Sequence, residues 1–179
     1  MRLFTALDVP EDIRARLTEL QSPEALGARW SPPEQFHITV RFIGEVPREQ
    51  GERYEQVLPQ IDVPPVECIP YGLDVLPSRR NPSVLVVGLE RTDDLMELYR
   101  AVSRALERQG LDPESRPYRP HVTLARLNQV SATAVHQFLD AHSDWSLPPF
   151  DAHAVHLYES TLTQDGAIHE HRRSVSLRS

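Results

Sequence analysis

The sequence contains no lysine, since all 19 of its basic residues are arginine. This excludes an enzyme that activates a nucleotide through a covalent lysine adduct, or that binds phosphate with a P-loop lysine. Cys68 is the only cysteine, which excludes an internal disulfide and a structural zinc site built on cysteine thiolates. Because Cys68 lies in an apolar, strand-like stretch, we expect its thiol to be buried and inert.

Long hydrophobic runs and net positive charge are also missing. No apolar run approaches the roughly 18 residues that cross a bilayer, and the first apolar stretch breaks at Asp8. We therefore expect a cytoplasmic protein without a membrane partner. The net charge is −7 with histidine neutral, whereas proteins that hold long nucleic acids present a basic face. These features favour a ligand that is a small phosphate compound or only the end of a nucleic acid.

The hydrophobic periodicity alternates between that of strands and that of helices. It predicts strands at 2–7, 36–43, 66–76, 83–89, 152–158 and 168–177, with a further strand that begins at His121. It predicts helices at 10–20, 49–60, 92–109 and 132–141. Thr92 and Gly110 are the expected N-cap and stop of the third helix, and Asp165-Gly166 is the expected turn of the last strand pair.

A four-residue motif occurs twice, as His37-Ile38-Thr39-Val40 and as His121-Val122-Thr123-Leu124. Each copy reads histidine, apolar, threonine, apolar, and each follows a proline-bearing loop. Side chains alternate between the two faces of a strand, so the histidine and threonine of each copy share one face and the apolar pair shares the other. A single copy is common by chance, but two copies at equivalent positions indicate a functional pair.

The motifs divide the chain into two similar halves. Each motif strand follows a helix and a loop and is followed by another helix, which we interpret as a duplication that is weak in sequence outside the motifs. The predicted fold is α/β (α+β) and bilobal, with pseudo-twofold symmetry, two antiparallel sheets that line a central cleft, and helices outside. No long linker separates the halves, so we expect residues 1–179 to form a single bilobal domain.

The motif pair suits acid–base chemistry on a phosphate ester. With an unperturbed pKa of about 6.5, one imidazole can take a proton from the attacking oxygen while another gives one to the leaving oxygen. The two threonine hydroxyls, on the same faces, can bind the non-bridging phosphate oxygens. The sequence therefore predicts His37 and His121 as catalytic residues, and Thr39 and Thr123 as substrate-binding residues.

These residues resemble a known family. The paired motifs are similar to those of the two-histidine phosphoesterase superfamily. Within this superfamily, three segments of the sequence resemble those of the bacterial and archaeal RNA 2′,3′-cyclic phosphodiesterases of the LigT or ThpR type. These proteins were formerly described as 2′-5′ RNA ligases. The three segments are Arg2-Leu3-Phe4-Thr5-Ala6-Leu7, Phe36-His37-Ile38-Thr39-Val40-Arg41-Phe42-Ile43-Gly44 and Pro120-His121-Val122-Thr123-Leu124-Ala125-Arg126. The resemblance implies a bilobal α/β fold and metal-independent hydrolysis of a 2′,3′-cyclic phosphate to a 2′-phosphate, on RNA ends or small cyclic nucleotides.

The resemblance also implies residue roles. It makes His37 the acid that protonates the 3′ oxygen and His121 the base for water, although the near-symmetry of the motifs leaves this division open. It adds Arg126 as a phosphate ligand. Strict alternation along the strand, however, places Arg126 on the face opposite His121, so a bulge or a strand end is required for its side chain to reach the site. The same parity places Arg41 on the His37 face, as a second candidate for phosphate or ribose binding.

Other readings stay open or are less favoured. Ligation of RNA 2′-5′ ends at the same site is an alternative reaction, and a non-catalytic nucleotide-binding module of the same fold is an alternative function. His169 and His171 share a strand face, but no third ligand has a suitable spacing, so we predict no metal site and no cofactor. Phe4, Phe42 and Trp30 could stack a base, but core packing is the favoured role for each. We expect a monomer.

Overall fold

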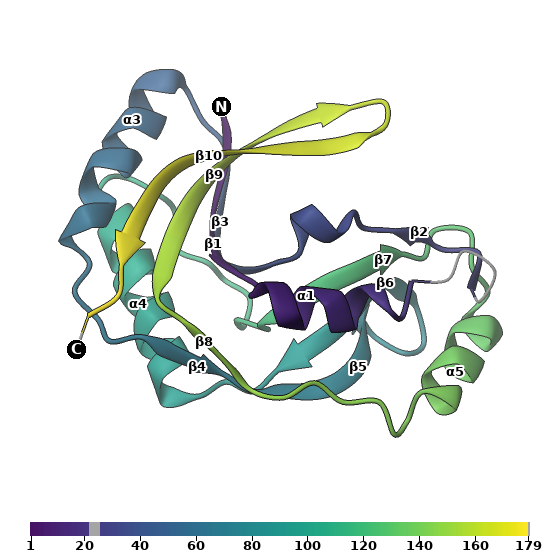
Figure 1. Ribbon diagram of the computed structural model, residues 1–179. Helices are drawn as coiled ribbons and strands as arrows, with labels where there is room; N and C mark the ends of the chain where they lie inside the picture. Colours follow the sequence, from purple (N-terminus) through teal and green to yellow (C-terminus); the bar gives the residue numbers. More distant parts are fainter. Residues whose placement is uncertain (22–25, 179) are drawn as a thin grey trace.

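The computed structural model describes residues 1–21 and 26–178. Its described strands form an eight-stranded antiparallel sheet and a separate two-stranded one, which together with the helices confirms the predicted α/β class (Figure 1). The order across the large sheet is β10-β9-β1-β3-β7-β6-β5, with β2 also paired to β7, while β4 pairs with β8. The strands are β1 Arg2–Asp8, β2 Arg29–Trp30, β3 His37–Glu45, β4 Val66–Cys68, β5 Pro70–Pro77, β6 Pro82–Leu89, β7 His121–Arg126, β8 Phe150–Ala152, β9 Ala154–Thr163 and β10 Gly166–Ser176.

The described helices begin and end close to the predicted positions. They are α1 Glu11–Thr18, α3 Arg48–Val57, α4 Asp93–Glu107 and α5 Ala132–Ala141, with 3₁₀ turns at Pro33–Gln35 and Leu58–Gln60. The Thr92 hydroxyl accepts a hydrogen bond from the Leu95 N–H at 3.2 Å, which confirms the predicted N-cap of α4. The helix predicted at 49–60 ends at Val57 and continues as a 3₁₀ turn, in which Pro59 lacks the N–H that an α-helical hydrogen bond requires.

The duplication is visible in the order of the elements. The series β1-α1-β3-α3-β4 recurs as β6-α4-β7-α5-β8, and equivalent strands pair with each other, β3 with β7 and β4 with β8. The strand predicted at 66–76 is divided by this pairing, because 66–68 joins β8 while 70–77 joins β6. The last strand pair forms the predicted hairpin around Asp165-Gly166, with longer strands than expected.

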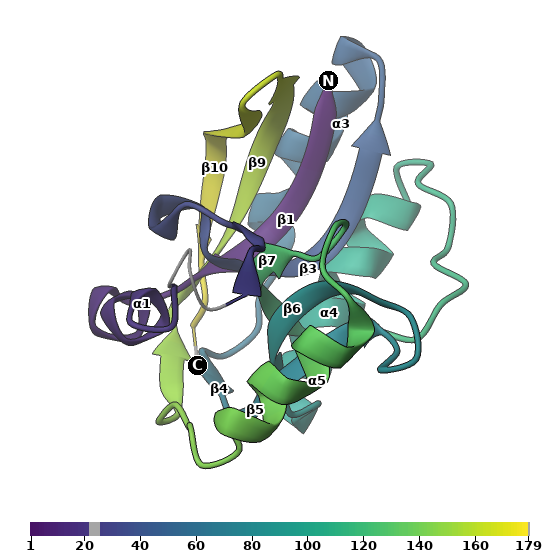
Figure 2. The same ribbon diagram turned by 90° about the vertical axis from the view of Figure 1, so that its right-hand side faces the viewer.

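Helix packing supplies the core on the far side of the motif strands. The apolar stripe of α4 is fully buried and the helix packs on β3 and β4; its members are Leu95, Leu98, Val102 and Leu106. Helix α3 lies beside α4 in both views (Figures 1 and 2). Cys68 is buried in the same core, as predicted. None of the helices in the described part of the chain has the length and apolar character that a bilayer crossing requires.

Candidate active site

The two motif strands lie side by side in the middle of the large sheet. His37 is the first residue of β3 and His121 is the first residue of β7. The strands are antiparallel, and Ile38 is paired with Val122. Both of these apolar side chains are buried. The pairing brings the two motifs together although 84 residues separate them in the sequence.

The four polar motif residues lie crosswise. In an antiparallel pair the partner numbers run in opposite directions, so this register places Thr123 level with His37 and Thr39 level with His121. All four side chains share one sheet face, since the apolar residues between them point to the other. Each of the four is partly buried. The two imidazoles therefore lie on one diagonal of the site and the two hydroxyls on the other.

The two imidazoles are oriented in the same way. Nδ1 of His37 lies 2.7 Å from the carbonyl oxygen of Gln35, and Nδ1 of His121 lies 2.7 Å from that of Arg119. A carbonyl oxygen can only accept, so Nδ1–H donates in both residues, and Nε2 is the nitrogen that exchanges a proton. In His37, Nε2 also lies 3.1 Å from Oγ1 of Thr39.

Burial lowers the pKa of both histidines. In each residue the hydrogen bond to a backbone carbonyl, of Gln35 or of Arg119, raises the pKa. The positive charge of His121 lowers the pKa of His37 and the carboxylate of Asp8 raises it, whereas the positive charge of Arg119 lowers the pKa of His121. Asp8 lies directly opposite His37 on β1. The two histidines therefore differ in their charged neighbours on the sheet, since His37 faces a carboxylate and His121 a guanidinium.

A one-residue bulge occurs at the same place in both motif strands. On β3 the pairing with β1 passes from Thr39 to Arg41, and on β7 the pairing with β6 passes from Thr123 to Ala125. The skipped residue is the last of each motif, Val40 or Leu124. Past the bulge the side chains have changed faces.

The bulge reverses the parity argument for the two arginines. Arg126 is exposed and falls on the His121 face, as its predicted role requires, and within the described residues its guanidinium has no hydrogen-bond or ion-pair partner. Phe42, not Arg41, occupies the equivalent position past the bulge on β3 and shares the His37 face. The prediction that Arg41 shares that face was wrong, because strict alternation ignored the extra residue.

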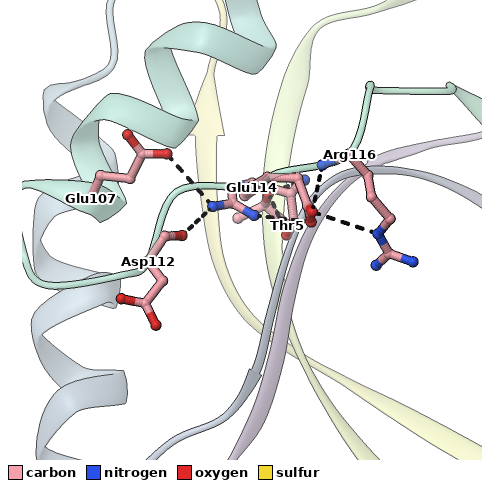
Figure 3. A network of polar contacts seen from close by, with 6 residues as sticks. Thr5, Glu107, Asp112, Glu114 and Arg116 are labelled. Carbon is pink, nitrogen blue, oxygen red and sulfur yellow. Dashed lines mark hydrogen bonds and ion pairs between the residues drawn. The ribbon is translucent and has the colours of Figure 1, made fainter.

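Arg41 instead belongs to a buried polar cluster behind the site. Figure 3 labels its partners Thr5, Glu107, Asp112 and Glu114. Its side chain is 4% exposed, it donates a 2.7 Å hydrogen bond to the carbonyl oxygen of Asp112, and it forms ion pairs of 3.6 and 3.5 Å with Glu107 and Glu114. The Thr5 hydroxyl accepts from the Arg41 N–H at 3.0 Å and donates to its carbonyl at 3.2 Å, so it satisfies the backbone at the bulge. Arg41 thus holds the loop that leads into the second motif.

Sequence reasoning missed a pocket of about 300 Å³ beside His37. Its lining residues come from β1, α1, β9, β10, the start of β3 and the 3₁₀ turn before it: Phe4, Asp8, Arg14, Glu34, Gln35, Phe36, His37, Tyr158, Ile168 and His169. The Phe4 ring lies 5.0 Å from that of His37, 5.5 Å from that of Tyr158 and 4.9 Å from that of His169, between ring centroids. The alternation of β1 could have assigned Phe4 and Asp8 to this face, but no local pattern places β9 and β10 next to β1.

Residues 1–21 and 26–178 contain no group of three or more His, Cys, Asp or Glu side chains placed to hold a metal ion. His169 and His171, the pair considered for a metal, contact different neighbours. His169 lies against His37 with ring centroids 5.4 Å apart, and His171 lies against Tyr158 at 5.7 Å. His169 is therefore part of the pocket wall, which its position in a terminal hairpin did not reveal.

Two similar halves, each presenting a histidine and a threonine from the start of a central strand, define a two-histidine phosphoesterase. A family model described as LigT like phosphoesterase matches residues 7–86 and again residues 87–169, so the chain belongs to this family. It is 28% identical over 172 residues to the RNA 2′,3′-cyclic phosphodiesterase of Methanocaldococcus jannaschii, covering 95% of this chain and 97% of that protein. It is 31% identical to the one of Bacillus subtilis over 69% of each chain. The crystal structure of TT0787 of Thermus thermophilus superposes with a TM-score of 0.81 at 25% identity, over 99% of this chain and 98% of that one.

Proposed function

We propose that this protein hydrolyses the 2′,3′-cyclic phosphate of RNA ends or nucleotides to a 2′-phosphate, by acid–base catalysis with His37 and His121 and without a metal. The observation that carries the proposal is the crosswise site, in which both histidines direct Nε2, not Nδ1, to the reaction. The curated relatives named RNA 2′,3′-cyclic phosphodiesterase support the substrate class. The reaction needs an acid and a base on opposite sides of one phosphorus atom, which the diagonal placement supplies.

His121 acts as the base in this proposal. Its Nε2 takes a proton from water as the water oxygen attacks phosphorus, and the P–O3′ bond breaks. Nε2 of His37 gives its proton to the leaving O3′, so the products are a 2′-phosphate and a 3′-hydroxyl. Asp8 beside His37 and Arg119 beside His121 favour this division over the reverse one. Each general acid or base contributes about 10²–10⁴-fold.

The threonines and Arg126 bind the phosphate oxygens. Thr39 and Thr123 lie on the second diagonal, where two hydroxyls can donate to the two non-bridging oxygens. The guanidinium of Arg126, which has no partner among the described residues and lies past the bulge on the same face, compensates their negative charge. Because O3′ is protonated by His37, the terminal nucleoside lies on the His37 side, where the pocket with Phe4 and Tyr158 receives it.

The decisive experiment is incubation with a 2′,3′-cyclic mononucleotide in the presence of a chelator. We expect a 2′-phosphate product, and a loss of at least about 10²-fold in kcat/KM in both His37→Ala and His121→Ala. His153→Ala, at an exposed histidine, is the matched control and should keep full activity. Full activity in either motif variant, a 3′-phosphate product, or a requirement for added metal would each contradict the proposal.

A further inference from the structure

Tyr71 is an exposed aromatic residue on the His121 side of the site. The pairing of β5 with β6 passes from Pro70 to Gly72, which leaves Tyr71 as a bulged residue. Its ring lies over Gly88, since a Cβ atom added at Gly88 would overlap the end of the ring. Gly88 is directly opposite His121. Residues directly opposite share a face, so the Tyr71 ring lies on the face that carries His121, one strand away from it.

The Tyr71 ring is held in place but is not covered. Its hydroxyl donates a 3.0 Å hydrogen bond to Oδ2 of Asp74, and Oδ1 of the same carboxylate accepts from the Val75 N–H at 2.8 Å. The hydroxyl end of the ring also lies against Gly88. Even so, the residue is 57% exposed. A rigid aromatic ring with an open face is a surface on which a nucleobase can stack.

A guanidinium lies on the same side of the site. Arg119 lies two residues before His121, in the loop that leads into β7. Its Nη1 donates a 3.1 Å hydrogen bond to the carbonyl oxygen of Pro77, so the side chain reaches from this loop to β5. Its positive charge acts on both neighbours: it adds to the burial that lowers the pKa of His121, and it opposes the burial that raises the pKa of Tyr71. Arg119 is exposed and remains available to an anion.

The two sides of the site differ in a way that assigns them different tasks. Opposite His37 stands Asp8, at the edge of a pocket with room for one nucleoside. Opposite His121 stands Gly88, which leaves space for Tyr71. A second base of the same RNA must lie outside the His37 pocket. The His121 side offers it an aromatic ring for stacking and a cation for the linking phosphate, a combination typical of single-strand binding surfaces.

We propose that Tyr71 and Arg119 form a subsite for the second nucleotide of the RNA, with its base stacked on Tyr71 and the phosphate that joins it to the terminal nucleotide bound by Arg119. This inference rests on the proposed function. It makes oligonucleotide ends, rather than cyclic mononucleotides, the preferred substrate class of this protein. Tyr71 and Arg119 are specificity-determining residues, and neither takes part in proton transfer.

The test compares a 2′,3′-cyclic mononucleotide with a dinucleotide that ends in the same cyclic phosphate. Wild type should have the lower KM for the dinucleotide. Tyr71→Ala should raise the dinucleotide KM by roughly 5- to 100-fold, the range expected for one stacked base, with kcat and the mononucleotide KM unchanged. Tyr71→Phe loses the bond to Asp74 but keeps the ring, so it should retain the preference. Arg119→Gln should raise the dinucleotide KM and make it less dependent on salt.

Phe42→Ala is the matched control, because Phe42 is 49% exposed and lies on the same face in the other half of the molecule. It should keep the preference for the dinucleotide. The inference is overturned if wild type shows no preference, if Tyr71→Ala affects both substrates equally, or if Phe42→Ala instead removes the preference. If wild type cleaves neither substrate, the proposed function fails. The subsite is then tested separately, by measuring the affinity of wild type and of Tyr71→Ala for a fluorescent dinucleotide 2′-phosphate. Equal affinities would overturn it.

Discussion

Thr5 on β1 fills the bulge of β3 with its hydroxyl, which bonds to both the N–H and the carbonyl of Arg41. This one side chain satisfies the two backbone groups that an extra residue removes from the regular ladder. The bulge in turn sets which residues past the first motif face the site. The geometry of the phosphate site therefore depends on a threonine on its far side.

Replacement of Thr5 by valine tests this dependence. Thr5→Val keeps the shape but leaves two buried backbone groups without a partner, so the free energy of unfolding should fall by about 1–3 kcal/mol in urea denaturation. Thr5→Ser keeps the hydroxyl and should lose less. Equal stability of the valine variant and wild type would show that the hydroxyl is not required at the bulge.

The Arg41 cluster makes a second stability prediction. Arg41→Met removes a buried cation from the partly exposed carboxylates Glu107 and Glu114 and from the Asp112 carbonyl, so unfolding free energy should fall by on the order of 2 kcal/mol. Arg53→Met, which breaks an exposed pair with Glu49, is the control and should change it by less than about 0.5 kcal/mol. A larger effect at Arg53 than at Arg41 would contradict the assignment.

Arg126 should matter for activity rather than stability. Because its guanidinium is unpaired among the described residues and faces the site, Arg126→Ala should lower kcat/KM for a cyclic mononucleotide by about 10- to 100-fold. Arg126→Lys keeps the charge but not the planar fork, so it should fall between the alanine variant and wild type. Unchanged kcat/KM in the alanine variant would remove Arg126 from the phosphate site.

The pH dependence should report the acid and the base. Burial lowers the pKa of both histidines, so the maximum of kcat/KM should lie below about pH 6.5. Asp8 raises the pKa of His37, and its removal in Asp8→Asn lowers that pKa. The protonated acid is then lost at lower pH, and the alkaline limb of the profile moves to lower pH.

Glu34→Gln, at another carboxylate of the pocket, is the control for this pH shift and should leave the alkaline limb in place. A shift of the acid limb in Asp8→Asn, with the alkaline limb unchanged, would show that His37 has the lower of the two pKa values and would remove the pKa argument for His37 as the acid.

Cys68 provides a check on the core. Burial raises the pKa of its thiol to about 12, so almost no thiolate is present at neutral pH. Iodoacetamide should leave the native protein unmodified at pH 8 and should label it once urea unfolds the chain, as measured by mass spectrometry. Labelling of native protein as fast as that of the unfolded chain would place Cys68 outside the core.

Much of the site could be predicted because its signals are local. The His-x-Thr-x alternation assigns two imidazoles and two hydroxyls to one face, and the repeat implies that equivalent strands meet. The sheet faces on which Arg41 and Arg126 lie could not be predicted in this way. A bulge interrupts the alternation in each strand, and nothing about the residue types of Val40 and Leu124 indicates it. The position of Tyr71 next to the site could not be predicted either. Its ring occupies the space left by the missing side chain of Gly88, which is seventeen residues later in the sequence.

The sequence by itself determined the class of fold, the two motif strands with their polar faces, and the exclusion of lysine and disulfide chemistry, because each follows from periodicity or from a missing residue type. Only the tertiary structure decided which charges surround each histidine. Asp8, Tyr158 and His169 come to His37 through strand pairing, and Tyr71 comes to His121 through the pairing of β5, β6 and β7, whereas Arg119 is only two residues from His121 in the sequence. Long-range pairing carries no local pattern, so the difference between the two halves appears only when the sheet is assembled.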